Sequence, residues 1–87
     1  MVKKEVTVLN ATGLHARPAS MFVQTAGKFK SKIFVIKEGN AINAKSIMGI
    51  MAGGISQGTT IEIQAEGDDE NDAVDALVQL INDKFGE

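Results

Sequence analysis

A single histidine stands in the segment GLHARPAS, and its neighbours could build an anion site around it. Gly13 permits a tight turn two residues before His15, and the residues after His15 have the features of a helix start. The first backbone amides of a helix have no intrahelical partner and lie at the positive end of its dipole. We therefore expect His15 to be an N-cap and a nucleophile, with Ala16 and Arg17 as phosphate-binding residues. The plainer interpretation is an exposed histidine beside a solvated arginine.

A serine in the segment AKSIMGIM is the second candidate. Ser46 stands where a hydroxyl could cap a helix, which contributes about 1 kcal/mol, and the apolar residues after it could simply belong to the core. A helix of about two turns that contains Gly49 cannot bury all of them. We therefore expect Ile47, Met48 and Met51 to form an exposed, adaptable patch that binds partner proteins.

Other chemistries find little support in the composition. The chain has no Cys and one His, and its acidic residues gather near the C-terminus, so we expect no metal site. It also lacks a glycine-rich phosphate loop with its lysine and carboxylates spaced for magnesium. We expect no cofactor, and a chain that bears phosphate without catalysing its transfer.

Patterns along the chain predict the elements that must position these residues. Alternating or β-branched runs predict strands, and apolar residues recurring every three to four positions predict helices. The strands are expected at 5–9, 32–37, 41–43 and 59–67, and the helices at 16–29, 47–52 and 68–86. The order β-α-β-β-α-β-α indicates an α+β fold, with an antiparallel or mixed sheet covered by helices on one side.

Length and charge limit the organisation further. With 87 residues the chain can build one hydrophobic core, so residues 1–87 are expected to form a single domain. It shows no apolar signal-peptide core and no run near the ~20 residues that cross a bilayer, so we expect a cytoplasmic protein without membrane insertion. Lys and Arg lie mostly in the first half and acids in the second, although the net charge is only −2. Such asymmetry can orient an approaching partner, but the plainer interpretation is that acids gather at one helix start and lysines at another helix end.

Two long segments carry a resemblance to a known family. GLHARPAS and AKSIMGIMAGGISQG, with QTAGKF between them and AEGDDENDAV after them, resemble HPr, the phosphocarrier of the bacterial phosphoenolpyruvate-dependent sugar phosphotransferase system. The resemblance implies an open-faced β-sandwich, in which three helices cover one side of a four-stranded antiparallel sheet. It also implies that enzyme I phosphorylates Nδ1 of His15 with the assistance of Arg17, and that IIA domains of sugar permeases accept the phosphoryl group.

The segment KSIMGIM is similar to the Gram-positive form of the family. That similarity implies regulatory phosphorylation of Ser46 by HPr kinase/phosphorylase, after which the protein binds a catabolite control protein in carbon catabolite repression. One departure concerns Ala52-Gly53, because the family usually has a larger residue such as Leu at the second of these positions. Thr12, near the active loop, is assigned no role.

Other functions remain as alternatives to this interpretation. A nitrogen-related paralogue of the phosphocarrier is disfavoured by Ser46 and its IMGIM context. An RNA-binding module is disfavoured because Phe34 is the lone strand aromatic and the pI is near 5.3, so we expect no nucleic-acid partner. A carrier that presents one surface to several partners in turn suits modest, fast contacts, and we therefore expect a monomer.

Overall fold

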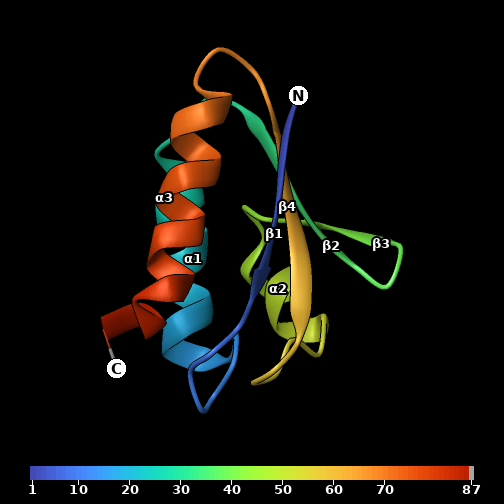
Figure 1. Cartoon of the computed structure of the whole chain (residues 1–87), viewed down its shortest axis with the longest axis vertical. Helices are drawn as coiled ribbons and strands as arrows, with labels where there is room; N and C mark the ends of the chain where they lie inside the picture. The colour runs from blue at the N-terminus through green and yellow to red at the C-terminus, as the bar shows by residue number, and fades with distance from the viewer. Residues whose placement is uncertain (87) are drawn as a thin grey trace.

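The computed structural model describes residues 1–86 and contains four strands and three α-helices followed by a short 3₁₀ turn (Figure 1). In chain order the elements are β1 (Val2–Thr7), α1 (Ala16–Gly27), β2 (Lys32–Lys37), β3 (Asn40–Asn43), α2 (Ile47–Ala52), β4 (Thr60–Glu66), α3 (Glu70–Asn82) and η1 (Lys84–Gly86). The predicted order β-α-β-β-α-β-α is therefore confirmed.

The strands form one antiparallel sheet in the order β1-β4-β2-β3. Val6 lies opposite Ile61 in the β1–β4 pair, and Val35 lies opposite Ile63 in the β2–β4 pair. Helices α1 and α3 lie side by side against one face of the sheet (Figure 1). This arrangement confirms the α+β class and the open-faced sheet covered on one side.

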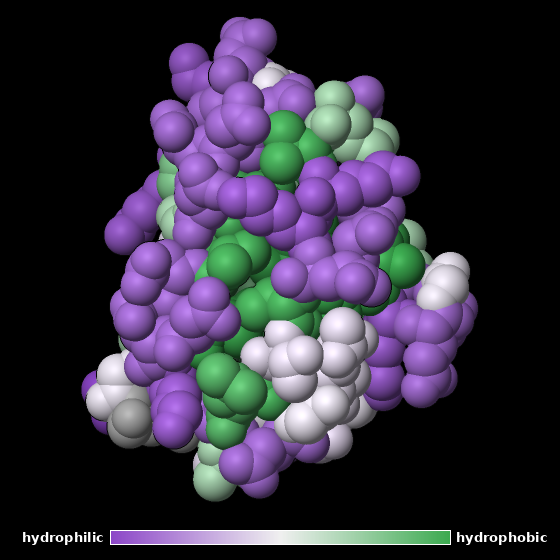
Figure 2. Space-filling model, viewed as in Figure 1, coloured by the Kyte–Doolittle hydropathy of each residue, from purple (hydrophilic) through white to green (hydrophobic). Residues whose placement is uncertain are grey.

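The core lies between the sheet and the helices. Residues of β4 alternate as the sequence predicts, with Ile61, Ile63 and Ala65 buried and their neighbours at least partly exposed. Phe22 of α1 and Leu77 of α3 are fully buried against this apolar face. In Figure 2 polar side chains cover most of the visible surface, and apolar surface shows between them along the seam between α3 and the sheet. Within residues 1–86, no helix has both the length and the apolar character needed to cross a membrane.

Two predicted boundaries at the N-terminal end were wrong. The first strand was expected at 5–9 but spans Val2–Thr7, because pairing with β4 recruits its polar first residues. The first helix was expected to reach Phe29 but ends at Gly27, with Lys28 as C-cap. The amide of Phe29 still donates to the carbonyl of Ala26 at 3.2 Å, so the helical apolar spacing persists through the cap.

The hairpin between β2 and β3 is tighter than expected. Glu38 (φ 50°) and Gly39 (φ 81°) are both in the left-handed region, as the two central residues of a type I′ turn must be. Lys37 then pairs with Asn40, so β3 begins at Asn40, one residue before the predicted start.

The last helix is shorter than predicted. It was expected over 68–86, but α3 spans Glu70–Asn82 and the chain then forms η1. Lys84 and Phe85 take positive φ angles of 55° and 56°, which end the helix. The turn returns the Phe85 side chain to the core, where it is 4% exposed.

Candidate functional site

His15 lies in front of the first turn of α1. It occupies the N-cap position with an extended backbone (φ −128°, ψ 149°), as predicted, and it is exposed. Its imidazole makes no capping hydrogen bond to the helix. Since the first amides of a helix have no intrahelical partner, those that follow His15 are placed to bind an anion.

Ala16 has a backbone conformation that the sequence did not predict. Its φ angle is 46°, in the left-handed region, which costs a residue with a Cβ roughly 1–2 kcal/mol. Ala16 and Arg17 are both exposed beside His15, whereas Pro18 is buried in the first turn and anchors the helix start. The strained residue therefore lies between the histidine and the arginine in the chain.

The loop that precedes His15 is stabilised by hydrogen bonds from a buried side chain. Asn10 is 2% exposed, and its Nδ2 donates to the carbonyl of Gly13 at 2.9 Å and to Oγ1 of Thr12 at 3.1 Å. Sequence reasoning missed Asn10 as a supporting residue. An Asn directly after a predicted strand, here the one expected at 5–9, is typical of a side-chain turn, and this is the signal that could have identified it.

A second set of contacts joins this loop to the segment after α2. Gly13 has a φ of 64°, and a Cβ there would lie 2.7 Å from Cα of Ser56. The amide of Leu14 donates to the carbonyl of Ile55 at 2.9 Å. The glycine predicted to permit a turn is therefore also needed for this close approach.

Residues from both segments line a shallow hollow of about 220 Å³ beside the histidine. The lining residues are Thr12, Leu14, His15, Met51, Gly54, Ile55 and Ser56. Met51 brings the predicted patch of α2 to the histidine, although the two residues are far apart in the sequence. Ala16 and Arg17 stand outside this lining set. The structure therefore brings together His15 and one end of α2.

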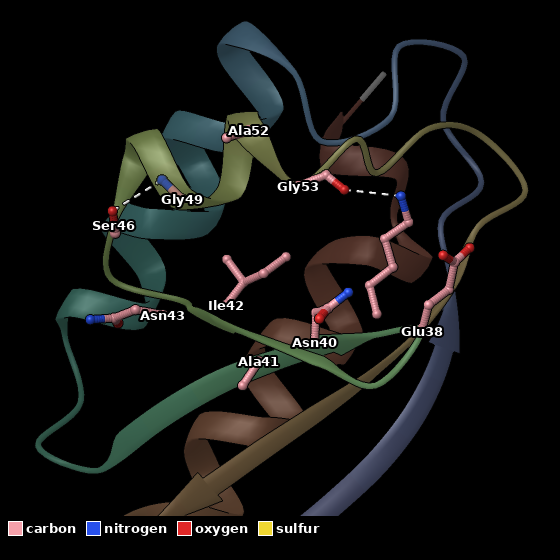
Figure 3. A pocket seen from close by; sticks show the side chains of 10 residues that line it. Glu38, Asn40, Ala41, Ile42, Asn43, Ser46, Gly49, Ala52 and Gly53 are labelled. Atoms are coloured by element: carbon pink, nitrogen blue, oxygen red, sulfur yellow. Dashed lines mark hydrogen bonds between the residues drawn. The ribbon is translucent and has the colours of Figure 1, made fainter.

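Ser46 lies at the other end of α2. It is the N-cap of the helix, and its Oγ accepts a hydrogen bond from the amide of Gly49 at 3.1 Å (Figure 3). The hydroxyl is half-buried at the surface. A modification of this oxygen would place its charge at the start of α2.

Helix α2 divides its apolar residues between the core and the surface. Ile50 is completely buried, whereas Met48 is 80%, Met51 41% and Ile47 39% exposed. These three exposed residues are here called the α2 patch, and one of them, Met51, lines the hollow beside His15.

The small residue at position 53 affects how α2 packs on the hairpin. A Cβ at Gly53 would lie 2.7 Å from Cδ1 of Ile42, so the isoleucine occupies space that a larger residue would take. An open hollow of about 460 Å³ lies here between α2 and the hairpin, with Ile42, Gly49 and Ser46 among its lining residues (Figure 3).

The perturbed carboxylates lie away from the histidine. Asp69 accepts hydrogen bonds from the hydroxyl of Ser31 and from the amides of Lys30 and Ser31, and these bonds lower its pKa. The hydrogen-bonded N-terminal amine, 3.1 Å from Oε2 of Glu70, lowers the pKa of that carboxyl. Both carboxyls lie at the start of α3, at the opposite end of the fold from the loop before α1 (Figure 1). Within residues 1–86, no group of three His, Cys, Asp or Glu side chains is arranged to hold a metal ion.

Comparisons with known proteins agree with this geometry. The family described as the PTS HPr component phosphorylation site matches residues 2–83. Phosphocarrier protein HPr of Neisseria meningitidis serogroup A is 46% identical over 87 residues, covering 100% of this chain and 98% of the relative. The HPr-like protein Crh of Halalkalibacterium halodurans is 52% identical over 81 residues, which cover 93% of this chain and 96% of the relative.

A solved structure agrees as well. The crystal structure of HPr-C-His from Thermoanaerobacter tengcongensis is 57% identical and superposes with a TM-score of 0.98, covering 100% of this chain and 98% of that one. The fold, the position of His15 at the start of α1 and these likenesses lead to one conclusion. The chain belongs to the HPr family of phosphocarriers of the sugar phosphotransferase system, which bear phosphate as protein substrates rather than catalyse a reaction.

Proposed function

We propose that this chain accepts a phosphoryl group from phospho-enzyme I on Nδ1 of His15 and passes it to IIA domains of sugar permeases. The observation that carries the proposal is an exposed histidine at the N-cap of α1, followed directly by the first amides of the helix and by the exposed Arg17. Exposure suits a carrier, because both the donor and the acceptor are proteins that must reach the same nitrogen.

The chemistry needs only a nucleophile and groups that stabilise negative charge. The lone pair of Nδ1 attacks phosphorus, a P–N bond forms, and the bond to the leaving group on enzyme I breaks. The helix amides and Arg17 can donate hydrogen bonds to the phosphoryl oxygens and stabilise their negative charge. The resulting phosphoramidate is reactive, so a nucleophile of a IIA domain can attack the phosphorus, the P–N bond breaks, and the lone pair returns to Nδ1.

The α2 patch is proposed as the docking surface for these partners. Met48 is 80% exposed and Met51 lines the hollow beside His15, so a protein that reaches the imidazole also meets these side chains. Methionine side chains are flexible and polarisable, which suits a surface that must fit several partners. Ile47 extends the same apolar area toward Ser46.

Regulation through Ser46 is proposed as a second feature of the chain. Its half-buried hydroxyl lies next to Ile47 at the start of α2, where HPr kinase/phosphorylase would add a phosphate. A phosphate there adds about two negative charges beside the α2 patch and should weaken the docking of enzyme I. The same modified surface would bind a catabolite control protein.

We propose that the chain works as a monomer. A carrier that serves several proteins in turn needs its His15 surface free. An HPr of Thermoanaerobacter tengcongensis that is 57% identical to this chain has been crystallised as a dimer, which is the alternative state that the measurement distinguishes. Light scattering coupled to gel filtration should give the mass of one chain, about 9.2 kDa.

Incubation with phosphoenolpyruvate and enzyme I tests the main proposal. We expect one phosphate per chain, on His15, in an acid-labile and alkali-stable adduct, and a labelled chain that discharges onto a IIA domain. His15→Ala should fold and remain unlabelled. Undiminished labelling of His15→Ala would refute the assignment. A wild-type chain that takes no phosphate from enzyme I, but is modified on Ser46 by the kinase, would instead identify a purely regulatory protein.

A further inference from the structure

Lys37, at the end of β2, donates to two backbone carbonyls and is not among the residues assigned to the transfer step itself. We propose that Lys37 is a positioning residue for the His15 site, because its ammonium group fixes the segment that forms one wall of the hollow beside the histidine. The inference rests on the proposed function of His15 and adds a residue from a different strand to that site.

The first step concerns the end of α2. A helix of six residues is too short to be stable alone, and the carbonyls of its last turn have no intrahelical partners. Nζ of Lys37 donates to the carbonyl oxygens of Gly53 and Gly54, each at 2.9 Å, and Figure 3 shows the bond to Gly53. A cation at this position is also favoured by the negative end of the helix dipole. Lys37 therefore holds the end of α2 from a neighbouring strand.

The second step leads from this end of α2 to the histidine. Gly54 accepts the bond from Lys37 and also lines the hollow beside His15. The next residue, Ile55, accepts a hydrogen bond from the amide of Leu14, which directly precedes His15. An unbroken series of contacts therefore runs from Lys37 through residues 54–55 to the backbone at His15.

The local glycines make room for the lysine. A Cβ at Gly54 would lie 3.3 Å from Nζ of Lys37, and Gly54 has a φ of 66°, which favours glycine. Lys37 is half-buried, and its two hydrogen bonds hold the ammonium group in place without any partner. Met51, in the last turn of the same helix, lines the hollow too. Loss of the two Lys37 hydrogen bonds, here called the Lys37 tether, should therefore disturb both the wall of the hollow at residues 54–55 and the docking surface at Met51. The pairing of the sheet should not change.

The test compares Lys37→Met with Lys32→Met. Both changes remove one positive charge from β2, but Lys32 is exposed at the far end of the strand. The amide hydrogen exchange rate of Leu14 measures the stability of its bond to Ile55, in the wall of the hollow. The exchange rate of Ala44, whose amide donates to the carbonyl of Ile33 at 3.0 Å, measures the stability of the neighbouring β2–β3 hairpin. Loss of a charged hydrogen bond should speed Leu14 exchange roughly tenfold in Lys37→Met and leave Ala44 unchanged.

The kinetic readout uses phosphoryl transfer from enzyme I to the intact chain. Lys37→Met should raise the KM for the carrier roughly three- to tenfold, because its docking surface is less ordered. Lys32→Met should behave as the wild type in both measurements. Lys37→Arg should recover most of the exchange protection and the transfer rate, because a guanidinium can also donate to two carbonyls.

Two results would overturn the inference. Equal acceleration of Leu14 and Ala44 exchange would show that Lys37 contributes only general stability. Unchanged transfer kinetics in Lys37→Met, with or without faster exchange, would show that the tether does not serve the His15 site. Failure of the proposed function is distinguishable, since it would appear in the wild type as the absence of phosphate on His15.

Discussion

Gly13 and Ile55 lie in direct backbone contact, and the loop that presents the histidine depends on it. Gly13→Ala would add a Cβ at a φ of 64° and against the backbone of residues 55–56. We expect a loss of about 2–5 kcal/mol in the free energy of unfolding, from the left-handed conformation and the overpacking together. Phosphoryl transfer should slow as well.

Gly39→Ala is the matched control for this change. Gly39 has a φ of 81°, but nothing lies within 4 Å of an added Cβ. Its loss of stability should be about 1 kcal/mol, from the conformation alone, with normal transfer. Denaturant unfolding of both variants measures the difference. Equal losses would show that the contact with Ile55 is not a tight one.

Substitution of Arg17 tests whether a hydrogen-bond donor that does not line the hollow beside His15 stabilises the phosphoryl group during transfer. Arg17 is exposed, so Arg17→Ala should leave the unfolding temperature nearly unchanged. Transfer from enzyme I should slow by about 10- to 1000-fold, because a charged, bidentate donor to the phosphoryl oxygens is lost. Arg17→Lys should recover only part of the rate. Wild-type kinetics for Arg17→Ala would assign the anion site to the helix amides alone.

Ser46 separates a capping role from a regulatory one. Ser46→Ala removes the acceptor for the amide of Gly49 and should cost about 1 kcal/mol without slowing transfer. Ser46→Asp keeps an acceptor at the helix N-terminus, where negative charge is favoured, and should fold normally. Its charge beside Ile47 should nevertheless raise the KM of the enzyme I reaction. The proposal fails if the Asp and Ala variants accept phosphate at the same rate.

The lowered pKa of Asp69 predicts how the free energy of unfolding depends on pH in the acid range. Its folded pKa is lowered by the Ser31 hydroxyl and the amides of Lys30 and Ser31, so the ionised form favours the folded state. The contribution is complete above the unfolded value of ~3.9 and is lost as pH falls through the folded pKa. Stability should therefore decline below about pH 4.

Asp69→Asn should lower stability at neutral pH and flatten part of this decline. Glu70, whose pKa is also lowered, accounts for a further part, so some dependence remains. Asp68→Asn removes the same charge one residue earlier and serves as the control. Unfolding midpoints between pH 2 and 7 measure both. An identical pH profile for Asp69→Asn and the wild type would contradict the assignment.

The sequence predicted the elements better than it predicted the contacts between them. Alternation identifies β4, and the burial of Ile61 and Ile63 follows the predicted face, because this pattern is local. The contact between the His15 loop and Ile55 joins segments about 40 residues apart, which no local pattern records. The left-handed φ of Ala16 had no signal either, since alanine is ordinarily helical there.

The exposure of Met48 gives the sharpest test of the α2 patch. Met48 is 80% exposed, so the carboxylate of Met48→Asp would remain in water and its unfolding temperature should fall by only a few degrees. The same substitution removes apolar contact from the proposed docking surface. The KM for the carrier in phosphoryl transfer from enzyme I should therefore rise about tenfold or more. Calorimetry and transfer kinetics on the same sample measure the two effects.

Ile50→Asp is the opposite case on the same helix. Ile50 is fully buried, and an unpaired charge there would cost several kcal/mol, a large part of the ~5–15 kcal/mol that stabilises a typical domain. This variant should therefore unfold at a much lower temperature and lose transfer because it loses its fold. If Met48→Asp behaved like Ile50→Asp, Met48 would be a packing residue and the α2 patch would lose its central member. If Met48→Asp kept both its stability and its KM, partners would reach His15 without contacting α2 at this position.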